Sequence, residues 1–176
     1  MKCLRTSLAV AVLVVAASLT VARAGAPKTA DGGKIHISVL TDRNLTPDLA
    51  AKQVEQYNQV GEFMEKDLVA TLAKAGYEAA PIQKKEEFTP GQGKYLLAWK
   101  IVRYSSGSKA ARMVVGFGAG ATSLDIHFTL SADGTQELLA KDDGVGSSRD
   151  WTFCCRKLDQ NIEKAVSAAL VPPAKP

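Results

Sequence analysis

The spacing of apolar residues changes twice in the first half of the chain, and this change limits the possible fold more than any other feature. Residues 34–40 alternate apolar and polar side chains, the period of a half-buried strand. From Tyr57 to Ala75 apolar side chains lie three or four positions apart, which places them on one face of a helix. Residues 77–82, which follow the helix stop at Gly76, are expected to form a short second strand. A strand, a helix and a second strand in this order predict a crossover unit with two parallel strands.

The second half of the chain predicts further strands and a second helix. The segments with strand character are residues 95–104, 113–117, 122–130 and 137–141. Residues 95–104 are apolar on both faces, as in the central strand of a sheet. Asp133-Gly134 is a hairpin turn signal before the last of these strands. Apolar side chains three or four positions apart then predict a helix over residues 151–169.

Local signals indicate where the two helices begin. Thr46 and Pro47 are a hydroxyl cap followed by proline at the first helical position, so we expect the first helix to begin there. Ser147 and Asp150 have the spacing of a capping box for the second helix. Asp142-Asp143-Gly144, just before it, is typical of a turn rather than of a calcium site.

Together these elements predict an α+β fold of two layers. We expect a mixed, largely antiparallel sheet of about five strands with two helices packed on one face. The elements lie in residues 34–170, which is the length of a single ordinary domain. Residues 25–33 are small and polar and are expected to form a flexible leader, and residues 171–176 a loose tail.

Residues 1–24 have the composition of a cleavable export signal. Lys2 and Arg5 precede an apolar run over residues 8–21, and Ala22-Arg23-Ala24 matches the small-x-small pattern of a cleavage site. The apolar run is shorter than the about 20 residues that span a membrane as a helix. We therefore expect cleavage between Ala24 and Gly25, no stable membrane span afterwards, and a mature protein that is periplasmic or secreted.

The charge of the mature chain excludes one large class of partners. The full chain has 22 basic and 18 acidic residues, and three of the basic ones, Lys2, Arg5 and Arg23, leave with the signal. The mature chain is therefore close to neutral and lacks the basic composition of a nucleic-acid-binding protein. It also lacks the run of lysine and arginine that binds anionic lipid. We expect no nucleic-acid partner.

Gly116-Phe117-Gly118-Ala119-Gly120-Ala121 has the spacing of a dinucleotide-binding motif. That motif needs a strand before it and a helix after it, whereas residues 122–130 alternate as a strand. Apolar side chains occupy odd positions before the glycine run and even positions after it, so the backbone must bulge or reverse within the run. We interpret Gly116, Gly118 and Gly120 as structural glycines, and we expect no cofactor.

Cys154 and Cys155 are the cysteines that remain after the signal is removed. Adjacent cysteines in a helix do not form a disulfide with each other, because normal geometry needs Cα atoms about 4.4–6.8 Å apart. The apolar stripe of the helix places Cys155 inward as a small buried hydrophobe and Cys154 at the edge. The alternative is that the pair serves a redox reaction or binds a metal.

His36 and His127 are the two histidines of the chain. Asp125 and His127 share the polar face of one predicted strand, which permits an Asp–His pair. A hydrolase triad would also need a nucleophilic serine, and no G-x-S-x-G sequence is present. We therefore interpret both histidines as ordinary strand residues and name no catalytic or metal-ligating residue.

A family resemblance runs through the middle of the chain. Its most specific part is the run from Arg112 to Gly120, and it also includes Tyr95-Leu96-Leu97, Gly107, Leu124 and Asp133-Gly134. These residues resemble the bacterial envelope family called domain of unknown function 4410, over roughly residues 34–170. The resemblance implies an exported, small αβ domain with no assigned enzyme activity. Many members of that family look like lipoproteins, whereas no cysteine directly follows the expected cleavage site here.

The layout is also similar, more distantly and only at the level of the fold, to periplasmic domains of the curli-secretion lipoprotein and of the Tol-system β-propeller protein. These observations favour a non-enzymatic binding or assembly module of the cell envelope, with an unknown envelope protein or ligand as its partner. Two alternatives remain. One is a redox or metal-binding periplasmic protein that uses Cys154 and Cys155. The other is a small periplasmic hydrolase, for which an apolar cleft around His36 or His127 would be the sign.

Overall fold

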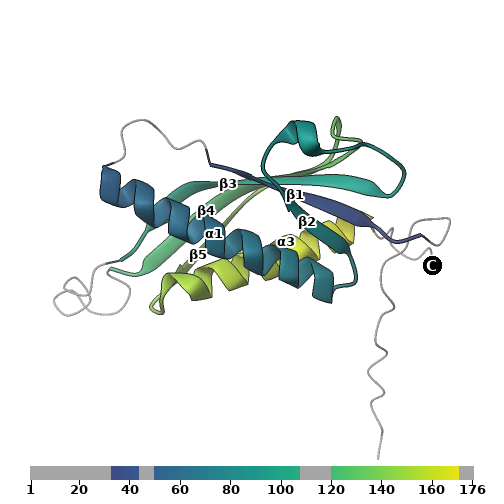
Figure 1. Ribbon diagram of the computed structural model, residues 1–176. Helices are drawn as coiled ribbons and strands as arrows, with labels where there is room; N and C mark the ends of the chain where they lie inside the picture. The colour runs from purple at the N-terminus through teal and green to yellow at the C-terminus, as the bar shows by residue number, and fades with distance from the viewer. Residues whose placement is uncertain (1–32, 44–49, 108–119, 171–176) are drawn as a thin grey trace, which may run out of the picture.

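The computed structural model describes residues 33–43, 50–107 and 120–170 of the 176-residue chain. Within these residues, five strands form one sheet in the order β2-β1-β3-β4-β5. Two long helices, α1 (Ala51–Lys74) and α3 (Trp151–Leu170), cover one face of the sheet, as Figure 1 shows. The predicted two-layer α+β fold is confirmed. The strands are β1 (His36–Asp42), β2 (Glu78–Ile82), β3 (Lys94–Ser105), β4 (Thr122–Ala132) and β5 (Gln136–Ser147).

The first half of the chain forms the predicted crossover unit. β1 pairs in parallel with β2 and with β3, and α1 connects β1 to β2. The helix begins at Ala51, later than predicted, and Thr46 and Pro47 lie outside the described residues. The backbone N–H of Ala50 donates to Oε1 of Gln53 at 3.0 Å, which satisfies a backbone group at the start of the helix.

The second half of the chain adds two antiparallel strands to this unit. β3 is the central strand of the sheet, as its two apolar faces predicted, and it pairs with β4, which pairs with β5. Asp133 and Gly134 have φ values of 54° and 72° and form the predicted hairpin turn between β4 and β5. The strand predicted over residues 113–117 lies outside the described residues.

Two local predictions are wrong. Asp142-Asp143-Gly144 is not a turn but part of β5, which continues to Ser147. The helix cap of α3 is Asp150 rather than Ser147: Oδ1 of Asp150 accepts a hydrogen bond from the backbone N–H of Phe153 at 3.1 Å. The hydroxyl of Ser147 instead accepts from the backbone N–H of Arg149, ahead of the helix.

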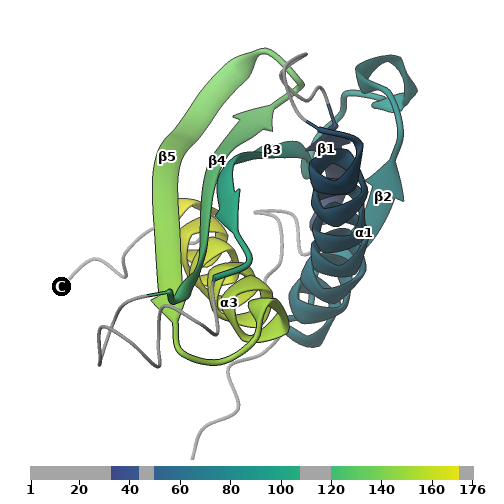
Figure 2. The ribbon, with the colours of Figure 1, turned by 90° about the vertical axis from the view of Figure 1, so that its left-hand side faces the viewer.

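The core lies between the sheet and the two helices. α1 and α3 run side by side in the same direction, and both press their apolar stripes against the sheet (Figures 1 and 2). Removing this apolar surface from water is the main contribution to stability. The buried side chains include Leu124, Ile126, Phe128 and Leu130 of β4, Met64, Leu68 and Leu72 of α1, and Leu158, Ile162 and Val166 of α3.

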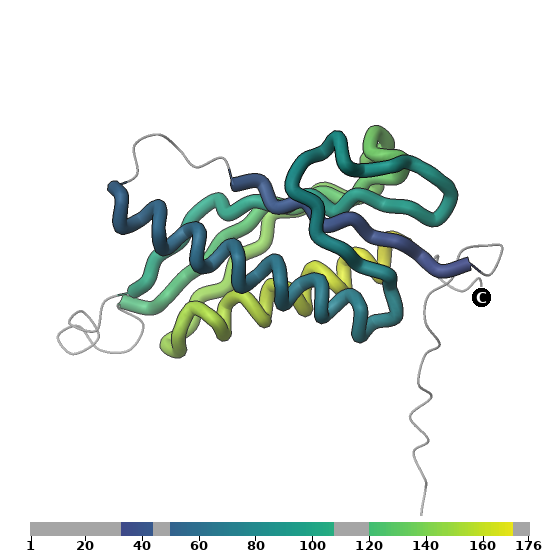
Figure 3. Tube along the Cα trace, in the orientation of Figure 1, coloured from purple at the N-terminus to yellow at the C-terminus, as the bar shows by residue number. Residues whose placement is uncertain are grey.

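The connection from β2 to β3 determines the shape of the other face, which we call the open face because neither α1 nor α3 covers it. β1 lies between β2 and β3 in the sheet, so residues 83–93 must cross β1. They cross on the open face and include the short 3₁₀ helix η1 (Lys85–Glu87), which can be followed in Figure 3. Phe88 is buried there, with its ring next to Gly134 of the β4–β5 turn.

Candidate functional site

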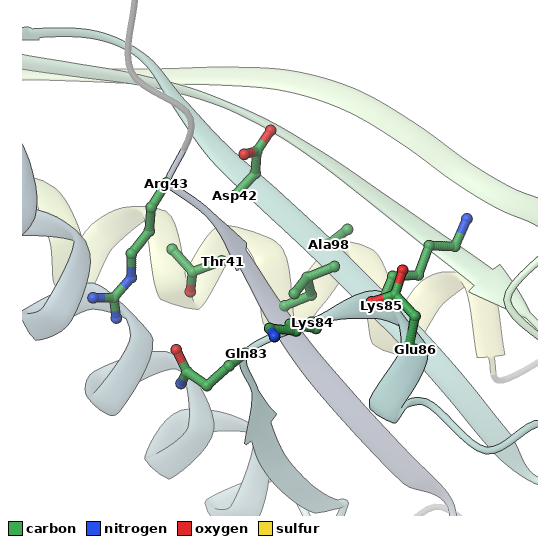
Figure 4. A pocket seen from close by; sticks show the side chains of 9 residues that line it. Thr41, Asp42, Arg43, Gln83, Lys84, Lys85, Glu86 and Ala98 are labelled. Carbon is green, nitrogen blue, oxygen red and sulfur yellow. The ribbon is translucent and has the colours of Figure 1, made fainter.

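A cleft of about 510 Å³ lies on the open face, at the end of β1. One wall comes from the last three residues of β1 and from Arg43, which follows the strand. The other wall comes from the segment that crosses β1 (Figure 4). Ala98 of β3 lies between these walls, and its small side chain leaves space there. The lining residues are Leu40, Thr41, Asp42, Arg43, Gln83, Lys84, Lys85, Glu86 and Ala98.

Next to this cleft, strand register places four polar residues in one row across the sheet. Asp42 of β1 is opposite Lys100 of β3, and Lys100 is opposite His127 of β4. His127 is in turn opposite Asp142 of β5. Asp42 and Ala98 also line a second cavity, of about 190 Å³, together with Lys100 and His127. The cleft and the row therefore form one surface. We call it the open-face groove, made of Asp42, Lys84, Lys85, Glu86, Ala98, Lys100, His127, Thr129 and Asp142.

Each histidine is bonded to a carboxylate on a neighbouring strand. Nδ1 of His127 lies 2.8 Å from Oδ1 of Asp142, and Nδ1 of His36 lies 3.0 Å from Oε2 of Glu78. In both cases the two residues are directly opposite in the strand register. The cysteines lie on the other side of the sheet, so they do not contribute to either pair.

An arginine–aspartate ion pair lies beyond the row. Nε of Arg103 donates to Oδ2 of Asp125 at 2.7 Å, so Asp125 is engaged with β3 rather than with the histidine two positions later on its own strand. Gly144 of β5 lies beside this carboxylate, and a Cβ there would collide with it. Val102, at the β-bulge next to Arg103, is 58% exposed.

The end of β1 is fixed to α1 by a buried carboxylate. Oγ1 of Thr41 donates to Oε2 of Glu65 at 2.6 Å, and Nη2 of Arg43 lies 3.3 Å from the same oxygen. Glu65 is only 8% exposed, and these two donors offset the cost of burying its charge. The Arg43 guanidinium therefore anchors the wall of the cleft, and the exposed amino groups of the groove are those of the three lysines.

Both thiols are buried under α3. Cys154 and Cys155 are each 0% exposed, so the prediction that Cys154 lies at the edge of the helix is wrong. Sγ of Cys154 donates to the carbonyl of Thr122 at 3.9 Å. Burial raises the pKa of both thiols, that of Cys155 to about 12. Both groups therefore stay protonated at neutral pH, whereas the thiolate is the form that reacts and binds metals.

The remaining predicted site residues have separate positions. Gly120 has a φ of 71°, a conformation that favours glycine. Gly116 and Gly118 lie outside the described residues, as do Ala24 and Gly25 of the predicted cleavage site. In the part of the chain that the structure describes, no group of three or more His, Cys, Asp or Glu side chains is placed to hold a metal ion.

Across the described ranges, no helix combines the length and apolarity needed to cross a membrane.

The open-face groove was not predicted from the sequence. Its residues come from β1, β3, β4, β5 and the crossing segment, and only the strand register brings them together. The polar positions of each strand were a signal that one face is exposed, but not that these particular residues form one row.

Solved structures show a similar fold. A PelC dodecamer from Paraburkholderia phytofirmans has a TM-score of 0.50 at 14% identity, covering 83% of this chain and 95% of that chain. A second PelC dodecamer from the same organism has a TM-score of 0.40 at 14% identity, with 82% and 91% covered. A structure described as a neuraminyllactose-binding hemagglutinin homolog from Helicobacter pylori has a TM-score of 0.37 at 9% identity, with 81% and 89% covered. At these identities the likeness concerns the fold alone.

Among curated proteins, none matches this sequence. The family described as "Domain of unknown function (DUF4410)" matches residues 14–148, a range that includes all five described strands and α1 and that stops before α3. The run from Arg112 to Gly120, on which the resemblance in the sequence depended, lies inside this range. The chain therefore belongs to the DUF4410 family, a domain of unknown function.

Proposed function

We propose that this protein is an exported module of the cell envelope that binds or assembles with a partner and does not catalyse a reaction. The observation that carries the proposal is the fold likeness to PelC, which covers 83% of this chain and 95% of that chain. PelC is a dodecamer, which supports assembly of several copies here as well. The export signal predicted in residues 1–24 supports a periplasmic or secreted location.

The proposed contact surface is the open-face groove. It combines exposed amino groups of Lys84, Lys85 and Lys100 with carboxylates of Asp42 and Glu86, on a sheet face that no long helix covers. Exposed charges of this kind contribute little to the stability of the fold. Across a contact surface, however, complementary charges select and orient the partner. The groove is therefore suited to recognition.

The mass of the mature protein in solution tests assembly. We expect light scattering of residues 25–176, purified without detergent, to give a multiple of the monomer mass. The same mass at low and high salt would indicate an interface with an apolar centre, because salt screens exposed charge pairs. A monomer at every protein concentration would contradict the proposal that copies of the chain assemble.

Charge reversal tests the surface. We expect Lys84→Glu combined with Lys85→Glu to reduce either the assembly or the recovery of a partner from envelope extract. The matched control is Lys157→Glu combined with Lys164→Glu, which makes the same charge change on exposed positions of α3. Equal effects of the two double variants would show that net charge, and not the groove, is responsible.

A further inference from the structure

The side of α3 that faces away from the sheet is basic. α3 lies beneath the curved sheet in Figure 2, so the positions opposite its buried stripe face away from the core. Four cationic side chains lie on this side, one of them just ahead of the helix, and all four are exposed. They are Arg149, Arg156, Lys157 and Lys164. We call these four residues, together with Phe153, the α3 outer face.

The acids close to these cations have other partners. Within the described ranges, no carboxylate forms an ion pair with any of the four cations. Oδ1 of Asp150 accepts from the hydroxyl of Thr152 at 2.7 Å, and Oε1 of Glu163 accepts from the hydroxyl of Ser167 at 2.9 Å. The bond from Thr152 is the largest cause of the lowered pKa of Asp150 and the charge of Arg156 is the smallest, so Asp150 offsets little of the positive charge.

The rest of the helix layer does not offset this charge either. Burial raises the pKa of Asp159, the remaining acid of α3, to about 10, so this group is uncharged at neutral pH. α1 carries three lysines and three acids on its exposed and half-buried positions, so it adds no net charge. They are Lys52, Lys66, Lys74, Glu55, Glu62 and Asp67. The positive charge of the helix layer is therefore concentrated on α3.

Two aromatic rings lie under the guanidinium groups of this surface. Cζ of Arg149 is 4.8 Å from the centroid of the Phe153 ring, and Cζ of Arg156 is 5.6 Å from that of Phe63. The Phe153 ring is half-buried, yet it is not among the described side chains that pack against the core. A guanidinium that stacks on a ring keeps its in-plane N–H groups free to donate. The α3 outer face thus offers anion-binding donors and an apolar ring at the same place.

The open face of a second copy of the chain is a poor match for this surface. A head-to-tail contact between copies would need an acidic patch to meet the α3 outer face. The charges of the open-face groove and of the neighbouring arginine–aspartate pair are balanced, with four basic side chains and four carboxylates. They are Lys84, Lys85, Lys100, Arg103, Asp42, Glu86, Asp125 and Asp142. A second copy therefore does not supply the negative charge through this face.

We propose that the α3 outer face docks on an anionic lipid surface. Arginine and lysine side chains donate to lipid phosphates and keep their charges at the headgroup level. An aromatic ring beside them enters the boundary between headgroups and acyl chains. The sequence has no continuous run of lysine and arginine, and it is the helix that brings these residues to one side.

This docking goes beyond the proposed function, because it does not use the open-face groove. The groove lies on the opposite face of the sheet from α3. With α3 against the lipid, the groove would face away from the membrane and stay accessible to a partner. The same fold would then hold the protein at a membrane surface with one layer and present a contact surface with the other.

Sedimentation of the mature protein, residues 25–176, with lipid vesicles tests the charge. We expect binding to vesicles of mixed phosphatidylcholine and phosphatidylglycerol, little binding to phosphatidylcholine alone, and release at high salt, because salt screens the headgroup charge. Lys157→Glu combined with Lys164→Glu is expected to weaken binding at least about 25-fold, since each basic side chain near an anionic surface contributes about fivefold. The matched control is Lys84→Glu combined with Lys85→Glu, with the same charge change on the open face and binding close to that of the parent.

Phe153 distinguishes a lipid surface from other anionic partners. Phe153→Ala is expected to weaken vesicle binding but to leave urea unfolding nearly unchanged, because this ring lies outside the core. In Phe153→Trp we expect tryptophan emission to be quenched by brominated lipid more than in the parent. Equal binding to both kinds of vesicle, or equal effects of the two double variants, would overturn the proposal. So would binding to soluble polyglutamate that is as tight as binding to vesicles and insensitive to Phe153→Ala, since it would identify an acidic polymer as the partner.

Discussion

At the scale of single residues, glycines in β5 leave space on the open face for neighbouring side chains. Gly144 and Gly146 lie on the same face of β5 but have different neighbours. A Cβ on Gly144 would collide with the carboxylate of Asp125, whereas the nearest atom to a Cβ on Gly146 is the carbonyl oxygen of Thr122 at 4.0 Å. The absence of a side chain at residue 144 therefore leaves the space in which the Asp125 carboxylate pairs with Arg103.

Replacing these two glycines with alanine is expected to change the free energy of unfolding differently. Gly146→Ala is expected to stabilise the protein by about 0.5–1 kcal/mol, because alanine loses less backbone entropy on folding. Gly144→Ala is expected not to stabilise the protein. The entropy gain from alanine is offset because Asp125 must move, which breaks an exposed ion pair worth about 0.2–1 kcal/mol. Urea unfolding measures both. In an Arg103→Ala background the gap between the two variants is expected to narrow, and equal effects in the parent would contradict the collision.

The burial of Cys154 shows a limit of predicting single residues from a helical stripe. The spacing predicted that Cys155 points inward, and it does. A single stripe of apolar side chains is what a helix needs to pack against one other element. α3 packs on α1 and on the sheet at the same time, so its buried face is wider than one stripe and includes Cys154. The sequence contains no local signal for this second contact.

At the scale of elements, the start of α3 depends on Asp150. The hydroxyl of Thr152 and the backbone N–H of Phe153 both donate to Oδ1 of Asp150, and these bonds lower the pKa of the carboxyl. A lowered pKa means that the stabilising effect is present above the unfolded pKa and is lost as pH falls through the folded pKa. The charge also lies at the positive end of the helix dipole.

We therefore expect Asp150→Ala to lower the melting temperature at neutral pH, and the difference from the parent to shrink in acid. Circular dichroism melts across the acidic range measure this. Ser147→Ala is the control, since that hydroxyl accepts a hydrogen bond from the backbone N–H of Arg149 before the helix, and a smaller change is expected. A larger loss for Ser147→Ala than for Asp150→Ala would show that the cap is wrongly assigned.

The error at Asp142-Asp143-Gly144 has a physical cause. Aspartate and glycine favour turns because of their local hydrogen bonding and backbone freedom. In β5 each residue has a partner from elsewhere in the fold. Asp142 bonds to His127, Asp143 accepts from Asn161 of α3, and Gly144 makes room for a carboxylate of β4. These tertiary contacts outweigh the local preference, and residue spacing alone does not reveal them.

At the scale of the whole molecule, the two layers and the parallel pairing of β1 with β2 follow from the periods of the sequence. The order of the five strands does not. It depends on residues 83–93 crossing β1, which places β3 on the far side of that strand. The open-face groove, which includes the cleft at Asp42, depends on this crossing, so it could not be predicted before the strand order was known.

The reactivity of the two thiols measures whether the helices have separated from the sheet. Cys154 and Cys155 are covered by the sheet and by α1, and their raised pKa keeps them protonated. We expect neither thiol to react with an aromatic disulfide reagent in the native mature protein at neutral pH, and both to react after unfolding. In rising urea the rate is expected to follow the unfolded fraction, because both thiols belong to the core between the sheet and the helices.

A Gln160→Cys variant is the control for thiol reactivity, because position 160 is exposed on the same helix. Its added thiol is expected to react at once while the two native thiols stay silent. A thiol of the parent that reacts rapidly without unfolding would contradict the buried placement and would favour the redox alternative.

The crossing of β1 also affects the order in which the chain reaches its fold. β4 and β5 close over the tight turn at Asp133 and Gly134, and contacts between segments that are near in sequence form quickly. His36 meets Lys94 only across a loop that contains α1, β2 and η1, which has a larger entropy of closure. We expect the joining of β1 to β3 to be the slow step. The strand that comes first in the sequence is then the strand that is placed last, and until that moment one edge of the central strand β3 is unpaired.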